Sequence, residues 1–567
     1  MRTRAIVGAA LAAVCGAGVL TACSEPVEPT VNYVLDGAVA TYNTESLEGS
    51  TRGAVMALSR VLPGFSYLGP DGRVIADTDI GTTTVESADS GALAVRYDIN
   101  PQAVYSDGVP LTCDALVLAW AAHSGRFGGF DVVSTAGYRD IDGVDCRAGS
   151  KTALVTFKPG RAYRDWKSLF GAGTLLPPQV VARAAGVATV VDPIEKSDRR
   201  TLGEIARIWN TGWTMTPGDF DPERFPALGP MRVDEYTTGG GLVLTANDRW
   251  WGQKAGDRRI TLWPRQTDVT GDLATGKSDA PVDVLDIAAG TFGADPLPRD
   301  QKSAPALPPP GLSPISSLGV ERIVLSGGGV FADPAVRRAF AACVPRDGLA
   351  REFGRGAPVA NTHLLGPDDL LTGAINSEFG RGYLQADPDR AGRESREARA
   401  GQGPLTIRIG YVAPDSRRAQ MVAAIAASCQ RAGITVTDVA SEQIGPRSLG
   451  RDTDALITAS GNGFAATGAA DPSRDTYAFY RGDPSNIGGY GNARVSALID
   501  QLAVTVPVSD RLPLLREIET LLWRDMPALP LFTAPRTQRA GDNVVNVVSG
   551  LSRSGTGWNI DRWLLTE

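Results

Sequence analysis

The first 22 residues constrain this chain most, because their pattern is typical of a segment that is removed during export. Arg2 and Arg4 give a positively charged start, and an apolar stretch over residues 5–19 follows. That stretch is too short to span a bilayer comfortably, and small residues precede Cys23. We therefore predict that residues 1–22 are a signal peptide, and we leave them out of the fold.

The residues around the predicted cleavage site carry a second signal. Leu20-Thr21-Ala22-Cys23 resembles the lipobox of bacterial lipoproteins. The resemblance implies that Cys23 receives a lipid, becomes the first mature residue and anchors the protein to the extracytoplasmic face of the cell membrane. Each buried methylene of an acyl chain contributes about 0.8 kcal/mol to such an anchor. The alternative is an ordinary cleaved signal peptide with a chance cysteine at position 23.

The composition is that of a large globular protein. Of 567 residues, 43% are hydrophobic and 21% are charged, and this length suggests two to four domains. The net charge of -7 argues against a nucleic-acid partner.

The sequence offers no set of residues for catalysis. His123 and His363 are the two histidines, and they do not form a zinc-binding motif. The Gly-x-Ser-x-Gly motif of serine hydrolases is absent. Residues 461–466 fit the Gly-x-Gly-x-x-Ala pattern of dinucleotide sites, but they lie late in the chain instead of opening a βαβ unit. We therefore expect no metal, no cofactor and no catalytic residue, and thus no enzyme.

Local signals predict alternating strands and helices. Asp333 before Pro334 is a typical helix start, and Asp415 or Ser416 can begin a helix that ends near Gly433. Strand-like residues 405–409 and 434–436 flank the latter helix and predict a strand, helix, strand unit.

Two further caps and two composition breaks complete this pattern. Thr112 is expected to cap a helix over residues 114–120, and Ser509 a helix that ends before Pro527. The proline-rich residues 295–311 read as a connector, and the charged residues 387–399 as a surface helix.

Several motifs resemble those of the dipeptide- and oligopeptide-binding proteins of ABC importers, solute-binding protein family 5. Residues 104–112 include Tyr105-Ser106-Asp107-Gly108 and resemble a family signature in which tryptophan usually stands at the place of Tyr105. Ser106, Asp107 and Gly108 are expected to form a tight turn, which makes this motif part of the scaffold. Similar matches follow in order at residues 228–233, 247–252, 336–340, 486–492 and 525–531.

The resemblance implies an α/β fold with two hinged lobes, the periplasmic-binding-protein-like fold of type II with an extra inserted domain. We expect residues 23–50, 195–315 and 536–567 to form lobe I. Residues 51–194 would form the inserted domain, and residues 316–535 would form lobe II.

The proposed domain boundaries suggest which cysteines form disulfides. Cys113, Cys146, Cys343 and Cys429 remain after the signal peptide and Cys23, and four cysteines allow three pairings. We expect Cys113 to bond Cys146 and Cys343 to bond Cys429, because each couple then falls within one part of the chain and an oxidising compartment favours disulfides. Four buried free thiols are the alternative.

The resemblance also implies a function. A peptide or other small solute would enter between the lobes, which close around it and deliver it to a membrane permease driven by cytoplasmic ATPases. The protein would work as a monomer, with the lipid as its membrane attachment. A lipoprotein of the same fold that acts as a cell-envelope scaffold or regulates glycolipid biosynthesis is the alternative.

Candidate ligand residues come from two segments that correspond to cleft segments of the family. Tyr42 and Asn43 follow the first strand. Ser460, Asn462 and Asp471 follow the strand expected near residues 455–458, and Asp471 would pair with a peptide's amino terminus. This region lacks the Trp and Asp that the family usually has directly after that strand.

Overall fold

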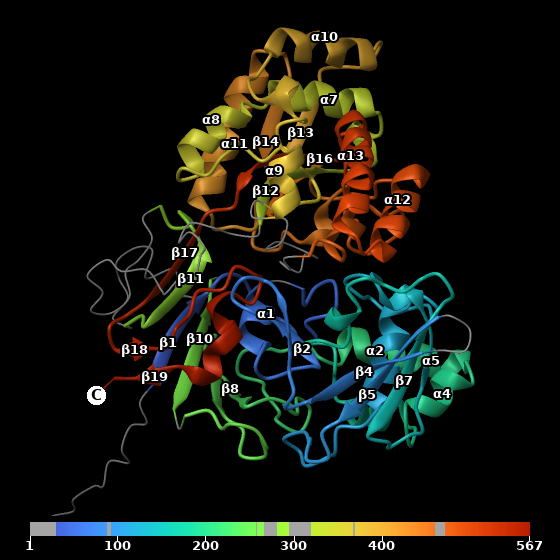
Figure 1. Ribbon diagram of the computed structural model, residues 1–567. Helices are drawn as coiled ribbons and strands as arrows, with labels where there is room; N and C mark the ends of the chain where they lie inside the picture. Colours follow the sequence, from blue (N-terminus) through green and yellow to red (C-terminus); the bar gives the residue numbers. More distant parts are fainter. Residues whose placement is uncertain are drawn as a thin grey trace, which may run out of the picture.

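The computed structural model describes residues 30–50, 52–87, 92–256, 258–265, 281–293, 319–366, 369–459 and 471–566. Figure 1 shows a two-lobed α/β protein, in which lobe II stands above lobe I and the inserted domain. The predicted fold class is therefore confirmed. We keep the names lobe I, inserted domain and lobe II for the parts of the chain proposed above. Within the described ranges, no helix is both long and apolar enough to cross a membrane.

Lobe I is built on a six-stranded mixed sheet in the order β17-β11-β1-β10-β9-β8. Strand β1 is parallel to both β10 and β11, whereas β17, from the end of the chain, runs antiparallel to β11. The strands are β1 (Thr30–Leu35), β8 (Met231–Tyr236), β9 (Leu242–Ala246), β10 (Arg259–Pro264), β11 (Val284–Ala288) and β17 (Arg536–Ala540), and the hairpin β18 (Val544–Val545) and β19 (Leu564–Leu565) follows. Because parallel strands need a long connection, the chain can leave lobe I after β1 and build another domain before it returns.

The inserted domain contains a four-stranded antiparallel sheet in the order β4-β5-β7-β6 and a short hairpin, β2-β3. These strands are β2 (Ser66–Leu68), β3 (Val74–Ala76), β4 (Gly81–Ser87), β5 (Leu93–Ile99), β6 (Ile141–Asp145) and β7 (Thr152–Phe157). The helices of this region are α1 (Arg52–Leu58), α2 (Asp114–His123), α3 (Pro178–Ala185), α4 (Val191–Glu195) and α5 (Arg199–Thr211). Helix α5, which our proposed boundary assigns to lobe I, packs against α3 and α4 of the inserted domain.

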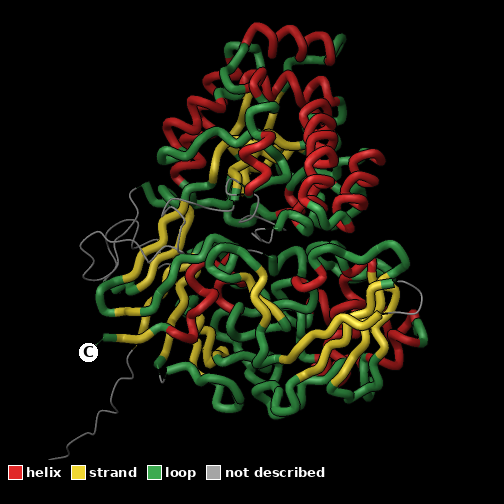
Figure 2. Tube along the Cα trace, in the orientation of Figure 1, coloured by secondary structure: helices red, strands yellow, loops and turns green. Residues whose placement is uncertain are grey.

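Lobe II contains a five-stranded sheet in the order β14-β13-β15-β12-β16. Every residue of β12, β15 and β16 is buried, and helices surround this sheet (Figure 2). The strands are β12 (Val320–Leu325), β13 (Thr406–Gly410), β14 (Thr435–Asp438), β15 (Ala455–Ala459) and β16 (Ala528–Thr533). The helices are α7 (Pro334–Cys343), α8 (Arg346–Phe353), α9 (Leu370–Ile375), α10 (Pro388–Ala398), α11 (Ser416–Gln430), α12 (Ala493–Val504) and α13 (Val508–Asp525).

The apolar cores follow the division into lobes. One core joins lobe I and the inserted domain, and a second fills lobe II around its sheet. A third, near α12 and α13, includes Ala136 of the inserted domain. Ala534 and Pro535 carry the chain from β16 in lobe II to β17 in lobe I. The lobes are thus linked by the backbone and also packed against each other.

Two of the predicted helix starts are confirmed. The Asp333 side chain accepts a hydrogen bond from the Ala335 N–H at the start of α7, and Asp415 accepts one from Arg418 at the start of α11. Strands β13 and β14, on either side of α11, are parallel, so the predicted strand, helix, strand unit is present.

Two predicted caps are wrong. Cys113 is the N-cap residue of α2, and the Thr112 hydroxyl donates to the Asp114 side chain instead of capping the helix. Helix α13 begins at Val508 after Pro507, so Ser509 lies inside its first turn. In both cases a hydroxyl residue stands near the helix start without accepting a backbone N–H.

The structure contains both predicted disulfides. Cys113 at the start of α2 bonds Cys146, which follows β6, and their Cα atoms are 5.8 Å apart. Cys343 at the end of α7 bonds Cys429 in α11, with a Cα separation of 4.9 Å. Each bond ties two elements within one part of the fold.

Candidate ligand-binding site

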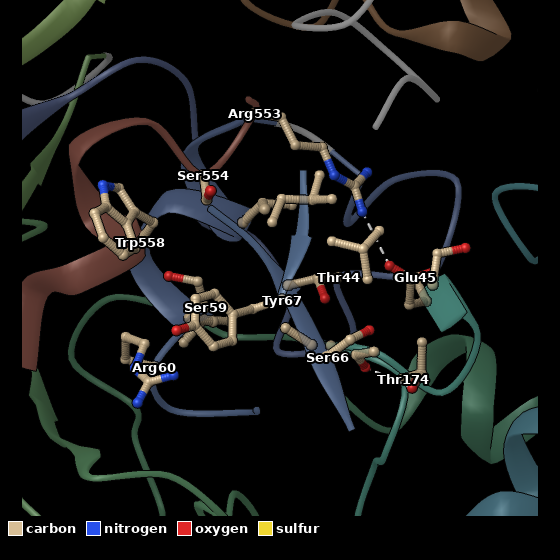
Figure 3. Close-up of a pocket in the computed structure, with 18 of the residues that line it drawn as sticks. Thr44, Glu45, Ser59, Arg60, Ser66, Tyr67, Thr174, Arg553, Ser554 and Trp558 are labelled. Atoms are coloured by element: carbon tan, nitrogen blue, oxygen red, sulfur yellow. Dashed lines mark hydrogen bonds and ion pairs between the residues drawn. The ribbon is translucent and has the colours of Figure 1, made fainter. Parts of the chain in front are cut away.

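A cavity is lined mainly by residues of lobe I and the inserted domain, together with Arg474 of lobe II (Figure 3). It holds about 840 Å³ of empty space, counting the space at its mouth. Its walls come from Thr44 and Glu45 after β1, from α1 and the residues after it, from the hairpin β2-β3, and from the loop over residues 165–174. The walls are completed by Arg553, Ser554 and Trp558 of lobe I and by Arg474 of lobe II. A concave site assembled from distant segments is typical of a small-molecule site.

Glu45 is the centre of a buried charge cluster in this wall. Its side chain is within 2.7 Å of Arg474 Nη2 and 3.0 Å of Arg553 Nη2, and His123 Nε2 lies 3.9 Å away. Burial alone would raise the pKa of the Glu45 carboxyl, but Arg474 and Arg553 lower it to about 2. Burial also lowers the pKa of His123 to about 4, against the opposing effect of Glu45. At neutral pH the cluster therefore holds a carboxylate, two guanidinium groups and a neutral imidazole.

Three charged residues of the cavity wall lie next to short 3₁₀ turns. Asp165 precedes η2 (Trp166–Ser168), Arg474 precedes η6 (Asp475–Phe479), and Arg553 lies just before η7 (Gly555–Arg562). The last turn is fixed by Asp286, whose carboxylate accepts a hydrogen bond from the Thr556 N–H at 2.8 Å. Gly555 has φ +53 and lies so close to Asp286 that a Cβ atom would be only 2.1 Å from its carboxylate, so glycine is required there.

Two polar atoms in the cavity wall have no hydrogen-bond partner among the residues that the structure describes. Nη1 of Arg553 and Oδ2 of Asp165 are both buried, and neither bonds to any group that the structure describes. Burial raises the pKa of Asp165 to about 7, and the neighbouring Asp471 contributes to the increase. Buried polar groups are normally satisfied in folded proteins, so both atoms call for an explanation.

An aromatic pair forms another part of the wall. The rings of Tyr67 and Trp558 are stacked, with centroids 6.4 Å apart and an interplanar angle of 17°. Arg60 lies 5.4 Å from the centre of the Tyr67 ring and is itself held by Asp77 and Asp561. Figure 3 shows Trp558 and Arg60 on one side of the cavity and Glu45 and Thr174 on the other. The cavity therefore has an aromatic side and a charged side.

Polar contacts also join lobe II to the inserted domain. The Asp483 carboxylate of lobe II accepts hydrogen bonds from the Ser134 hydroxyl at 3.1 Å and from the Thr135 N–H at 2.9 Å. Arg161 of the inserted domain bonds Asp500 of lobe II at 2.9 Å. Lobe II and the inserted domain are therefore in direct polar contact in this structure.

Comparisons with known proteins agree on one family. Residues 82–485 match the bacterial extracellular solute-binding proteins, family 5. The chain belongs to this family. It is 40% identical over 554 residues to the lipoprotein Rv2585c of Mycobacterium tuberculosis, which covers 97% of this chain and 95% of the relative. It is also 26% identical over 530 residues to the oligopeptide-binding protein OppA of Mycobacterium bovis, which covers 89% of this chain and 80% of the relative.

The fold is shared with solved structures of the family. The oligopeptide-binding protein AppA from Bacillus subtilis, in complex with a nonapeptide, superposes with a TM-score of 0.72 at 15% identity, over 95% of this chain and 99% of AppA. Family 5 solute-binding proteins bind solutes and are not enzymes.

In this family 5 protein, Tyr42 and Asn43 lie in the core and not on the cavity wall. The Tyr42 ring stacks on Trp213, and its hydroxyl donates to the Pro226 carbonyl at 3.1 Å. The Asn43 side chain donates to the Trp209 carbonyl and accepts from the Glu45 N–H at 3.1 Å. Asn43 therefore positions Glu45, whereas the residues that line the cavity begin at Thr44.

The other predicted ligand residues divide into two groups. Asp471 is described, and its Oδ1 lies 2.8 Å from Arg164 of the inserted domain and accepts a hydrogen bond from the Ser473 N–H. Asp471 is near the cavity, because its charge contributes to the raised pKa of Asp165. Its Oδ1, however, is already bound to Arg164 and Ser473. Ser460, Asn462 and the predicted lipidation site Cys23 lie outside the described residues.

Proposed function

We propose that this family 5 protein captures short peptides outside the cytoplasm by closing its two lobes around them. It then delivers the peptide to the permease of an ABC importer, whose ATPase subunits drive transport. A lipid on Cys23 holds the protein at the outer face of the membrane, where it works as a monomer. The match to OppA over most of the chain supports peptides as the ligand class, and the lipoprotein name of Rv2585c supports the anchor.

One observation carries this proposal. Arg474 belongs to lobe II, yet it lines the cavity and contacts Glu45 of lobe I. The cavity wall is therefore complete only when the lobes meet. A ligand that touches both lobes binds the closed state more tightly than the open state, and this difference in affinity shifts the hinge equilibrium towards closure.

The alternative of an envelope scaffold or glycolipid regulator is not favoured. A scaffold does not need an empty cavity whose wall combines buried charges with a stacked aromatic pair. Relatives that match 89% or more of this chain are named as lipoproteins or as an oligopeptide-binding protein, whereas the probable monoacyl phosphatidylinositol tetramannoside-binding protein LpqW of Mycobacterium tuberculosis matches 65% of it at 23% identity.

Thermal melting with defined ligands tests the proposal. At a hundredfold excess over its Kd, a bound peptide adds about 2.7 kcal/mol to the free energy of unfolding. A pool of short peptides should therefore raise the melting temperature at neutral pH, whereas sugars and envelope glycolipids should not. A rise with glycolipids alone would favour the regulator, and no rise with any peptide would contradict peptide capture.

A further inference from the structure

A second pocket lies within lobe II and is smaller than the cavity described above. It holds about 290 Å³ of empty space, counting the space at its mouth. Its described wall residues come from β12, from η6, from the loop over residues 485–490 and from the start of β16. All of these residues belong to lobe II, and none of them lines the larger cavity. The pocket is therefore a separate site.

Arg322 is the one charged residue that the structure describes in this wall. It is 8% exposed, and its Nε is buried without a hydrogen-bond partner. Its guanidinium group makes no hydrogen bond and no ion pair with any residue that the structure describes. Burial lowers the pKa of this group to about 10, against the opposing effect of Asp475. Arg322 is therefore charged at neutral pH, in surroundings that disfavour the charge.

Other buried arginines of lobe II show how such a charge is normally accommodated. Arg346 donates hydrogen bonds to the carbonyl oxygens of Pro530 and Gly380. Arg417 pairs with the Glu321 carboxylate at 3.1 Å. A buried charge that has neither kind of partner is destabilising, so the Arg322 guanidinium calls for an acceptor from outside the chain.

The remaining wall indicates which acceptor fits. Its apolar part is formed by Val324, Ala478, Phe479, Ile487, Pro527 and Ala528. The polar side chains Ser485, Asn486 and Tyr490 already donate their hydrogens to other groups. A divalent anion such as sulfate would exchange a strongly bound hydration shell for a single guanidinium group. A weakly hydrated monovalent anion loses less on entering such a wall, and it balances the one positive charge.

We propose that this pocket binds a small monovalent anion, of the class of chloride and bromide, on the Arg322 guanidinium. The site is distinct from solute capture in the larger cavity. Phe479, whose ring centre lies 5.7 Å from Arg322 Cζ, ends the turn η6. Arg474, which contacts Glu45 of lobe I, directly precedes the same turn. The bound anion therefore stabilises lobe II beside the turn that positions Arg474.

Melting curves in matched salts test this site on the whole protein. Sodium chloride, sodium bromide and sodium gluconate are compared at equal ionic strength and neutral pH, because gluconate is a bulky, strongly hydrated anion that should not enter the pocket. Each tenfold increase in chloride above its Kd should raise the melting temperature by about 1 °C, as mass action requires. Gluconate should cause no such rise.

The line width of the chloride NMR signal gives a direct measure of binding. Exchange with a site on the protein broadens this signal, and bromide should reverse the broadening because it competes for the same guanidinium group. We expect the chloride concentration that gives half of the saturable broadening to match the concentration at which the melting temperature begins to rise.

Arg322→Met assigns both effects to one side chain. Methionine keeps the apolar length of the arginine stem but has no charge, so the chloride response and the saturable broadening should be lost. In gluconate this variant should be at least as stable as the unaltered protein, because no unpaired buried charge remains. Arg494→Met is the matched control, since Arg494 is exposed in lobe II in an ion pair with Glu517, and it should keep the chloride response.

The outcomes decide the assignment without reference to peptides. Equal melting temperatures in chloride and gluconate, with no saturable broadening, would mean that water alone occupies the pocket and would overturn the proposal. A folded Arg322→Met that keeps the full chloride response would overturn it as well. Arg322→Gln replaces this variant if circular dichroism shows that Arg322→Met does not fold. Failure of the anion site would leave solute capture by the larger cavity untouched.

Discussion

Glu45 of lobe I and Arg474 of lobe II lie 2.7 Å apart, so one buried ion pair joins the lobes at the cavity wall. Asn43 orients Glu45 through its backbone N–H, and Arg553 holds the second carboxylate oxygen. Asn43 and Arg553 therefore hold Glu45 in place, and Arg474 reaches its carboxylate from lobe II.

Replacing Glu45 tests this ion pair. Glu45→Gln leaves two buried guanidinium groups without a carboxylate, and breaking a buried pair in this way typically costs about 3–5 kcal/mol. We expect a loss of this order in the free energy of unfolding at pH 7, measured by urea denaturation. Glu86→Gln is the control, because Glu86 pairs with Arg96 at the surface and should change little.

The same variant makes a prediction about pH. The pKa of Glu45 is lowered from 4.5 to about 2, so its stabilising effect is fully present above pH 4.5 and is lost as the pH falls towards 2. The difference in stability between the unaltered protein and Glu45→Gln should shrink across that range. A difference that stays constant from pH 5 down to the acid-unfolding limit would contradict the assignment.

The two disulfides should be present in the exported protein. Peptide mapping without reduction should show Cys113 bonded to Cys146 and Cys343 bonded to Cys429, as in the structure. Each loop contributes about 4 kcal/mol in the chain-entropy model, so reduction should lower the melting temperature. Free thiols at all four positions would contradict this prediction.

Membrane attachment should depend on Cys23. We expect Cys23→Ala to block lipoprotein processing or to release a soluble form, because the acyl chains supply the anchor. Membrane fractionation and the mass of the mature protein check this result. A variant that stays at the membrane with the mass of the unaltered protein would show that the lipobox interpretation is wrong.

Features set by neighbouring residues could be predicted from the sequence. Asp333 and Asp415 begin their helices as expected because a cap depends on a few adjacent residues. Thr112 and Ser509 were misplaced by one or two residues, since a hydroxyl near a helix start need not accept a backbone N–H.

The cavity could not be predicted in the same way. Its charged wall residues come from four distant segments of the chain: Glu45, Asp165, Arg474 and Arg553. Three of these residues lie next to short 3₁₀ turns, which have no periodic pattern of hydrophobic residues in the sequence. Tyr42 and Asn43 directly precede Thr44 and Glu45, and all four side chains are buried, although only Thr44 and Glu45 line the cavity. Only the three-dimensional packing decides which of them line the cavity.

Solution scattering with and without peptide tests ligand capture by closure most directly. The radius of gyration of the unliganded protein should fall when a saturating pool of short peptides is added. Glu45→Gln should show a larger starting value, because the ion pair that joins the lobes is missing. Peptides that bind by calorimetry but leave the radius of gyration unchanged would contradict capture by closure.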